Sequence, residues 1–125
     1  YFIDAGTPDA WMDGVLRCIE EKRFSTGAVV DGSWHAKPKA FDTAHVQGCM
    51  IEADVTLQGC HIERSTLLSG VAVGFKSHLR NCLVGRGASV GSNVSMEGVV
   101  VDHGSTVPDG TSQVGGQWPK TEPSA

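Results

Sequence analysis

A large aliphatic residue recurs at every fifth or sixth position between Ala44 and Gly110 of this 125-residue chain. A small or β-branched residue stands two positions before each of them, which supports the same register. Residues two apart share one face of a strand, so each short segment directs one large and one small side chain to the same side. The large residues are Val46, Ile51, Leu57, Ile62, Leu68, Val73, Leu79, Val84, Val90, Met96, Val101 and Val107.

This period predicts a parallel β-helix, in which three short segments complete each turn of the coil. Grouping the segments by three gives about four stacked turns, with neighbouring strands ~4.8 Å apart. A β-sandwich is disfavoured, because sandwich strands usually recur at intervals of about 8–12 residues. The repeat resembles that of hexapeptide-repeat proteins, and the resemblance implies a left-handed coil. The predicted inner columns are Val46/Ile62/Leu79/Met96, Ile51/Leu68/Val84/Val101 and Leu57/Val73/Val90/Val107.

The chain opens with the stretch YFIDAGTPDAW, which predicts two further elements. Tyr1–Ile3 is a short aromatic and β-branched run typical of a strand. Thr7–Asp9 has a capping hydroxyl, a proline and an acid, which are typical of a helix start. An amphipathic helix is predicted over residues 8–22, because apolar residues fall on one helical face. These residues are Trp11, Val15, Cys18 and Ile19.

The predicted fold class is therefore all-β: a left-handed parallel β-helix preceded by a short strand and one amphipathic helix. Residues 25–43 are predicted to be a connecting region without a clean period. We expect the coil over 44–110 and a C-terminal tail over 111–125. Residues 1–24 form the opening strand and helix.

Charge and composition disfavour several classes of partner. The formal net charge is −4 and no Lys/Arg cluster occurs, so neither nucleic acid nor an anionic membrane is an expected partner. No signal peptide or membrane-spanning run is seen, and we expect a cytoplasmic protein. Cys49, Cys60 and Cys82 occupy small inward positions, and Cys18 lies on the helix face. We interpret all four as core residues of a reducing compartment rather than as disulfides or metal ligands.

The opening strand, the Asp-Ala-Gly-Thr-Pro sequence, the helix and the coil together resemble the C-terminal part of a sugar-1-phosphate nucleotidyltransferase. These enzymes transfer a nucleotidyl group from an NTP to a sugar 1-phosphate. The resemblance implies that residues 1–24 end a catalytic domain, that Asp4 helps to hold Mg²⁺ there, and that NTP and sugar 1-phosphate bind to that domain. The coil is then an assembly or regulatory domain. We expect this chain alone to be inactive, with no catalytic residue and no cofactor of its own.

Two other functions remain open at this point. A hexapeptide-repeat acyltransferase would use a histidine as general base. A metal enzyme resembling the γ-carbonic anhydrases would need three histidines converging on one zinc ion with an open position for water. Both alternatives leave the opening strand and helix unexplained.

A histidine ladder is predicted on the first face of the coil. His45, His61 and His78 each precede an inward aliphatic residue, so they should point outward and stack. We interpret them as part of a polar solvated face rather than as a metal site or a pH sensor, because stacked outward rings diverge from any one centre.

The second face is predicted to carry an apolar stripe of Met50, Leu67, Leu83 and Val100, one residue per turn. An exposed apolar patch of this kind usually marks an interface. We expect a homo-oligomer, most simply a symmetric dimer formed through this stripe. The alternative covers are the catalytic domain or the tail that carries Trp118.

Overall fold

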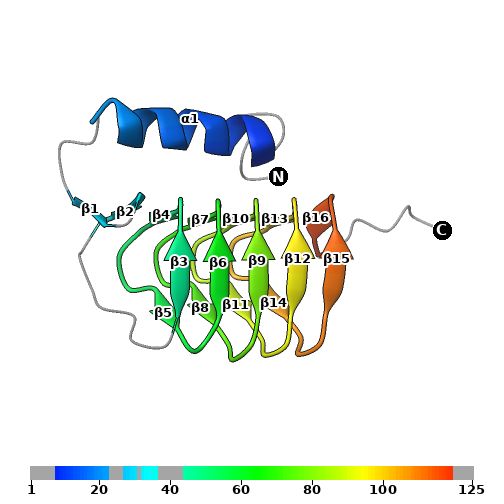
Figure 1. Cartoon of the computed structure of the whole chain (residues 1–125). Helices are drawn as coiled ribbons and strands as arrows, with labels where there is room; N and C mark the ends of the chain where they lie inside the picture. Colours follow the sequence, from blue (N-terminus) through cyan, green and yellow to red (C-terminus); the bar gives the residue numbers. More distant parts are fainter. Residues whose placement is uncertain (1–7, 23–26, 31, 37–43, 120–125) are drawn as a thin grey trace.

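The computed structural model describes residues 8–22, 27–30, 32–36 and 44–119. It contains a β-helix with one α-helix along its side (Figure 1). The predicted opening strand and Asp4 lie outside the described residues. Within those residues, no helix has both the length and the apolar character needed to cross a membrane.

Three parallel sheets form the walls of the coil, and one strand of each sheet belongs to each full turn. The first sheet contains β3 (His45–Gln47), β6 (His61–Glu63), β9 (His78–Arg80), β12 (Ser95–Glu97) and β15 (Ser112–Val114). The second contains β4 (Met50–Ile51), β7 (Thr66–Leu67), β10 (Leu83–Val84), β13 (Val100–Val101) and β16 (Gln117–Trp118). The third contains β5 (Thr56–Leu57), β8 (Ala72–Val73), β11 (Ser89–Val90) and β14 (Thr106–Val107). The predicted parallel β-helix is confirmed.

The coil is longer than predicted, with about five turns instead of four. Strands β15 and β16 continue it past Gly110, to Trp118. In this last turn Gln113 and Trp118 stand in register with the aliphatic residues of the turn before. The aliphatic period therefore ends before the coil does.

The segment predicted as a connection contains two strands, β1 (Ala28–Val30) and β2 (Ser33–His35). Strand β2 pairs in parallel with β4 and extends the second sheet by one strand, whereas β1 pairs with β2 in the antiparallel sense. Ser33 and His35 are buried in the small and large inward positions of this added strand. Burial lowers the pKa of His35 from its ordinary value, which favours the neutral imidazole. This side chain stands in register with Ile51 of the core.

One inner column differs from the prediction. Leu67, not Leu68, aligns with Ile51 and Val84, and it is fully buried. Ser65 occupies the small inward position, and its hydroxyl accepts a hydrogen bond from the Cys82 backbone N–H at 3.0 Å. The error came from two adjacent leucines. In every turn the second-sheet residue follows the first-sheet residue by five positions, and this rule selects Leu67.

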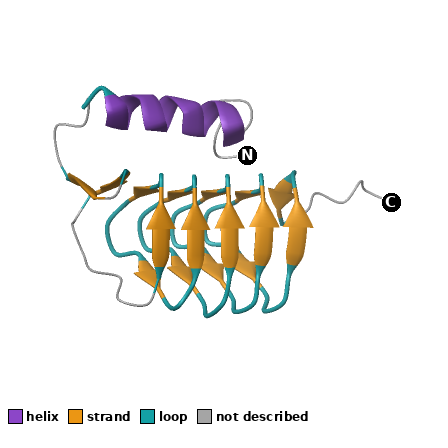
Figure 2. Ribbon diagram, in the orientation of Figure 1, coloured by secondary structure: helices purple, strands orange, loops and turns teal. Residues whose placement is uncertain are grey.

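The predicted helix is confirmed as α1 (Pro8–Glu20). Pro8 supplies the first helical position, Asp9 lies in the first turn and Arg17 in the last, where each charge favours the helix dipole. Figure 2 shows α1 running along the length of the coil, beside several of its turns. The helix thus spans the stack of strands instead of packing on a single turn.

The register makes a direct prediction about two neighbouring leucines. Leu67→Ala should lower the free energy of unfolding by about 2–5 kcal/mol, because it empties a fully buried position. Leu68→Ala is the matched control and should cost about 1 kcal/mol or less, because Leu68 is only half-buried. Urea unfolding of both variants measures the difference. A larger loss of unfolding free energy for Leu68→Ala than for Leu67→Ala would show that Leu68 is the inward residue.

Candidate functional site

The most distinctive surface of the domain is the outward side of the second sheet, which α1 covers. The positions in register along it are Trp34, Met50, Thr66, Leu83, Val100 and Gln117, here called the second-sheet column. Met12 and Val15 of α1 are buried against Leu83 and Val100 of this column. Trp11, Ile19 and Met50 complete the same apolar cluster.

Thr66 is the one hydroxyl residue within this apolar contact, and both of its hydrogen-bonding capacities are used. The Trp11 indole Nε1–H donates to the Thr66 hydroxyl oxygen at 2.9 Å. That hydroxyl donates in turn to the Met12 sulfur at 3.1 Å. Because a buried hydroxyl without a partner destabilises the fold, Thr66 fixes the position of α1 along the coil.

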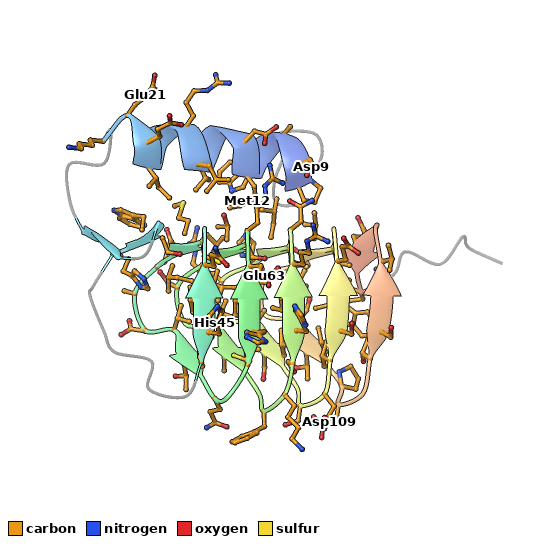
Figure 3. All side chains as sticks on the ribbon, in the orientation of Figure 1. Asp9, Met12, Glu21, His45, Glu63 and Asp109 are labelled. Carbon is orange, nitrogen blue, oxygen red and sulfur yellow. The ribbon has the colours of Figure 1, made fainter. Side chains whose placement is uncertain are left out.

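A polar cluster holds the first turns of α1 to one corner of the coil. The Arg64 guanidinium donates to the Asp9 carboxylate at 2.6 Å, and it also donates to Asp13. It makes a third bond, to the Asn81 side-chain oxygen at 2.8 Å. The Asn81 amide donates to the same Asp9 oxygen at 2.8 Å. Figure 3 shows Asp9 at the start of α1 and Met12 pointing from the helix toward the coil.

The backbone of Arg64 is unusual for its residue type. Its φ is +45°, in the left-handed region, and the equivalent corner positions of other turns hold Gly48, Asn81 and Gly98. Glycine and asparagine adopt this conformation readily, whereas a long side chain is disfavoured there. The Arg64 guanidinium at this corner contacts Asp9 and Asp13 of α1, which glycine or asparagine could not do in the same way.

The apolar contact contributes more to docking than the charges do. Each fully buried aliphatic side chain contributes about 1.5–3 kcal/mol. The carboxylates of Asp9 and Asp13 are 70% and 66% exposed, and exposed pairs of this kind contribute about 0–1 kcal/mol each. The polar cluster therefore selects the orientation of α1, while the second-sheet column supplies the stability.

The structure corrects the predicted interface stripe. Met50, Leu83 and Val100 point outward as expected, but Leu67 points into the core and Thr66 takes its place. In this chain α1 packs on the stripe, which agrees with the alternative cover by the segment predicted to end the catalytic domain. A homo-oligomer stays a prediction.

The histidine ladder on the first sheet is confirmed. His45, His61 and His78 are exposed and pair in register on β3, β6 and β9. The ring centroids of His45 and His61 are 4.7 Å apart with an edge-to-face angle of 84°. Those of His61 and His78 are 5.4 Å apart with an interplanar angle of 45°. Each ring lies close to the next ring along the ladder, but the ring planes are not parallel.

A row of charged residues runs beside the histidines, two positions further along each strand. Glu63 pairs in register with Arg80, and Arg80 with Glu97. The Arg80 guanidinium donates to Glu97 at 3.2 Å. The Glu63 carboxylate also lies 4.0 Å from Nε2 of His78. Figure 3 shows His45 and Glu63 on this wall of the coil, with Glu63 toward the end that lies nearer α1.

The cysteines are confirmed as free thiols. Cys49, Cys60 and Cys82 are buried, whereas Cys18 is half-buried. Burial raises the pKa of Cys49 to about 12 and that of Cys82 to about 11, so neither is a nucleophile at neutral pH. Burial also raises the pKa of Cys60.

Sequence analysis missed Arg64, Asn81 and the role of Thr66. The available signal was an arginine at a corner position otherwise held by glycine or asparagine, together with Asp9 and Asp13 one helical turn apart. Recognising that α1 covers the second sheet would have joined these two observations.

Part of the chain matches the model of a known family. The family described as "GlmU-like, C-terminal hexapeptide" matches residues 35–120, which is more than half of the chain. The match supports the predicted left-handed coil of hexapeptide repeats. A comparison with curated proteins finds no significant match.

The docking of α1 predicts the effect of a charge placed beneath it. Leu83→Glu should weaken docking by about 2–5 kcal/mol, because it removes a fully buried leucine from the contact. Amide hydrogen exchange should accelerate over residues 8–20, while the coil strands keep their protection.

The matched control is Ser89→Glu, at the equivalent outward position of the exposed third sheet. It should leave exchange in α1 unchanged. Protection of α1 that persists in Leu83→Glu would mean that the helix is held elsewhere.

Proposed function

The chain belongs to this family of GlmU-like C-terminal hexapeptide domains, and on that premise we propose that it is the β-helix domain of a sugar-1-phosphate nucleotidyltransferase. The whole enzyme would transfer a nucleotidyl group from an NTP to a sugar 1-phosphate. The β-helix would hold catalytic domains in a fixed arrangement or regulate them, and it would contribute no catalytic residue of its own.

The main support for this proposal is the packing of α1 against the coil. The Asp-Ala-Gly-Thr-Pro sequence that resembles the end of a catalytic domain leads directly into α1. Apolar contacts and a polar cluster then fix α1 to several turns of the coil. A catalytic domain that ends in this helix would be joined rigidly to the coil, as an assembly domain requires.

The chemistry of the proposed reaction would depend on the preceding domain, which would bind the NTP and the sugar 1-phosphate. Mg²⁺ would neutralise phosphate charge during the transfer. Asp4 is the proposed contribution of this chain to Mg²⁺ binding, because carboxylate oxygens are ligands that this ion prefers.

An oligomer and a cytoplasmic location form part of the same proposal. Because α1 occupies the second sheet, a contact between two coils would use another surface, and the first and third sheets are available for it. The buried free thiols are consistent with a reducing compartment.

An activity assay tests the proposal. The protein encoded by the intact gene is incubated with Mg²⁺ and a panel of NTPs and sugar 1-phosphates, and release of pyrophosphate is measured. We expect turnover by that protein and none by the 125-residue chain. Asp4→Asn in the active protein should lower kcat by orders of magnitude, because an amide is a poor Mg²⁺ ligand.

Two results would contradict the proposal. Turnover by the 125-residue chain alone would show that it carries its own catalytic site. Transfer of an acyl group from a thioester donor by the intact protein, without pyrophosphate release from any pair in the panel, would favour the acyltransferase alternative.

A further inference from the structure

The first sheet brings together ligand types that transition-metal ions prefer. Imidazole nitrogens bind Ni²⁺, Cu²⁺ and Zn²⁺, and carboxylates can complete such sites. His61 and His78 lie on adjacent parallel strands in direct register, with ring centroids 5.4 Å apart. The Glu63 carboxylate lies 4.0 Å from Nε2 of His78. His78 thus lies near both the His61 ring and the Glu63 carboxylate.

From this geometry we propose that His61, His78 and Glu63 form a surface binding site for one divalent transition-metal ion of the Ni²⁺, Cu²⁺ or Zn²⁺ class. The two imidazoles are the principal ligands, and the carboxylate adds a third donor and a negative charge. Water fills the remaining positions. The proposal does not rest on the proposed nucleotidyl transfer, because none of its three residues is among those named above in the α1 contact.

The ligands need only a small adjustment to close on an ion. Metal–ligand bonds of about 2.0–2.2 Å place two donors of one tetrahedral ion about 3.4 Å apart. The 4.0 Å from His78 to Glu63 is therefore about half an ångström too long for Zn²⁺. It is about one ångström too long for Ni²⁺ or Cu²⁺, whose square-planar or tetragonal sites place adjacent donors about 2.9 Å apart. As the described residues stand, no three or more His, Cys, Asp or Glu side chains are placed to hold a metal ion, so the proposed site requires its side chains to rotate together. The side chains of His78 and Glu63 are 52% and 40% exposed, which leaves them free to rotate.

The ring orientations differ from those of a regular stack. Divergence of stacked rings was the reason to expect a polar face rather than a metal site. The His61 and His78 rings are inclined at 45° to each other, so a rotation about each side chain can direct one nitrogen of each ring to the same point. A pair is sufficient, and the third histidine is not needed.

The site is assigned to His61 and His78, rather than to His45 and His61, by the residue beside the pair. Gln47 occupies the position next to His45 that Glu63 occupies next to His61. A neutral amide is a weaker ligand for these ions than a carboxylate. On the other side, Arg80 is engaged by Glu97 at 3.2 Å, which offsets its repulsion of a cation.

Titration of the untagged 125-residue chain with Ni²⁺ tests the proposal. Calorimetry gives the affinity and stoichiometry, and NMR spectra of the imidazole groups identify the histidines that the ion broadens. We expect one ion per chain, with the strongest broadening at His61 and His78 and weaker broadening at His45, whose ring centroid lies 4.7 Å from that of His61. His61→Ala and His78→Ala should each weaken binding by about tenfold or more, and Glu63→Gln should weaken it less.

His45→Ala is the matched control, because it removes a neighbouring exposed imidazole and keeps the proposed ligands. Binding to this variant should stay within about twofold of the unaltered chain. Thermal unfolding of each variant shows whether it is folded. Absence of binding at millimolar Ni²⁺, binding unchanged by His61→Ala and His78→Ala, or an equal loss in His45→Ala would each overturn the proposal.

Discussion

The contact between α1 and the second-sheet column determines the architecture of this domain. A coil of this kind has three outer walls, and a wall that carries Met50, Leu83 and Val100 is unstable in water unless something covers it. The part of the column from Trp34 to Val100 extends over five strands, a length of about 19 Å at the spacing of parallel strands. The 13 residues of α1 are about 20 Å long. The helix therefore matches this part of the column in length, and the apolar sides of the two pack together.

The core beneath this wall depends on a second constraint, the repeat of strand spacing. Like side chains stack in the inward columns, and the small inward positions of the buried core carry cysteine, serine, alanine or valine. Hydroxyls at these positions also accept hydrogen bonds from the backbone of the next turn, as Ser33 does from Cys49 at 2.8 Å and Ser77 from Val94 at 3.1 Å. The same geometry aligns the outward residues, which is why the histidines and the charges of the first sheet form continuous rows.

Much of this could be predicted from the sequence. The period of large and small residues predicts the parallel coil, and the spacing of Trp11, Val15 and Ile19 predicts α1. The prediction failed where local chemistry was ambiguous. Leu67 and Leu68 are equally apolar, and only the constant five-residue step selects between them. Gln113 and Trp118 break the aliphatic pattern, although they stand in register with Met96 and Val101 of the turn before.

The cover of the second sheet was missed for a different reason. A one-dimensional pattern shows that a stripe is apolar, but it does not show which surface buries it. The complementary evidence lay far away in the sequence, in the apolar face of α1 and in the carboxylates of Asp9 and Asp13. Arg64 joins these regions across 55 and 51 residues, and no periodicity reports such a contact.

Nuclear Overhauser contacts between the Trp11 indole N–H and the Thr66 side chain test the central claim, that α1 is docked on the second sheet of its own coil. The two groups share a hydrogen bond of 2.9 Å, so a strong contact is expected, together with contacts from Met12 to Leu83. A dilution series and a mixture of differently labelled chains confirm that the contact is within one chain. A Trp11 indole that shows no contact with Thr66 and exchanges freely with water would contradict the account.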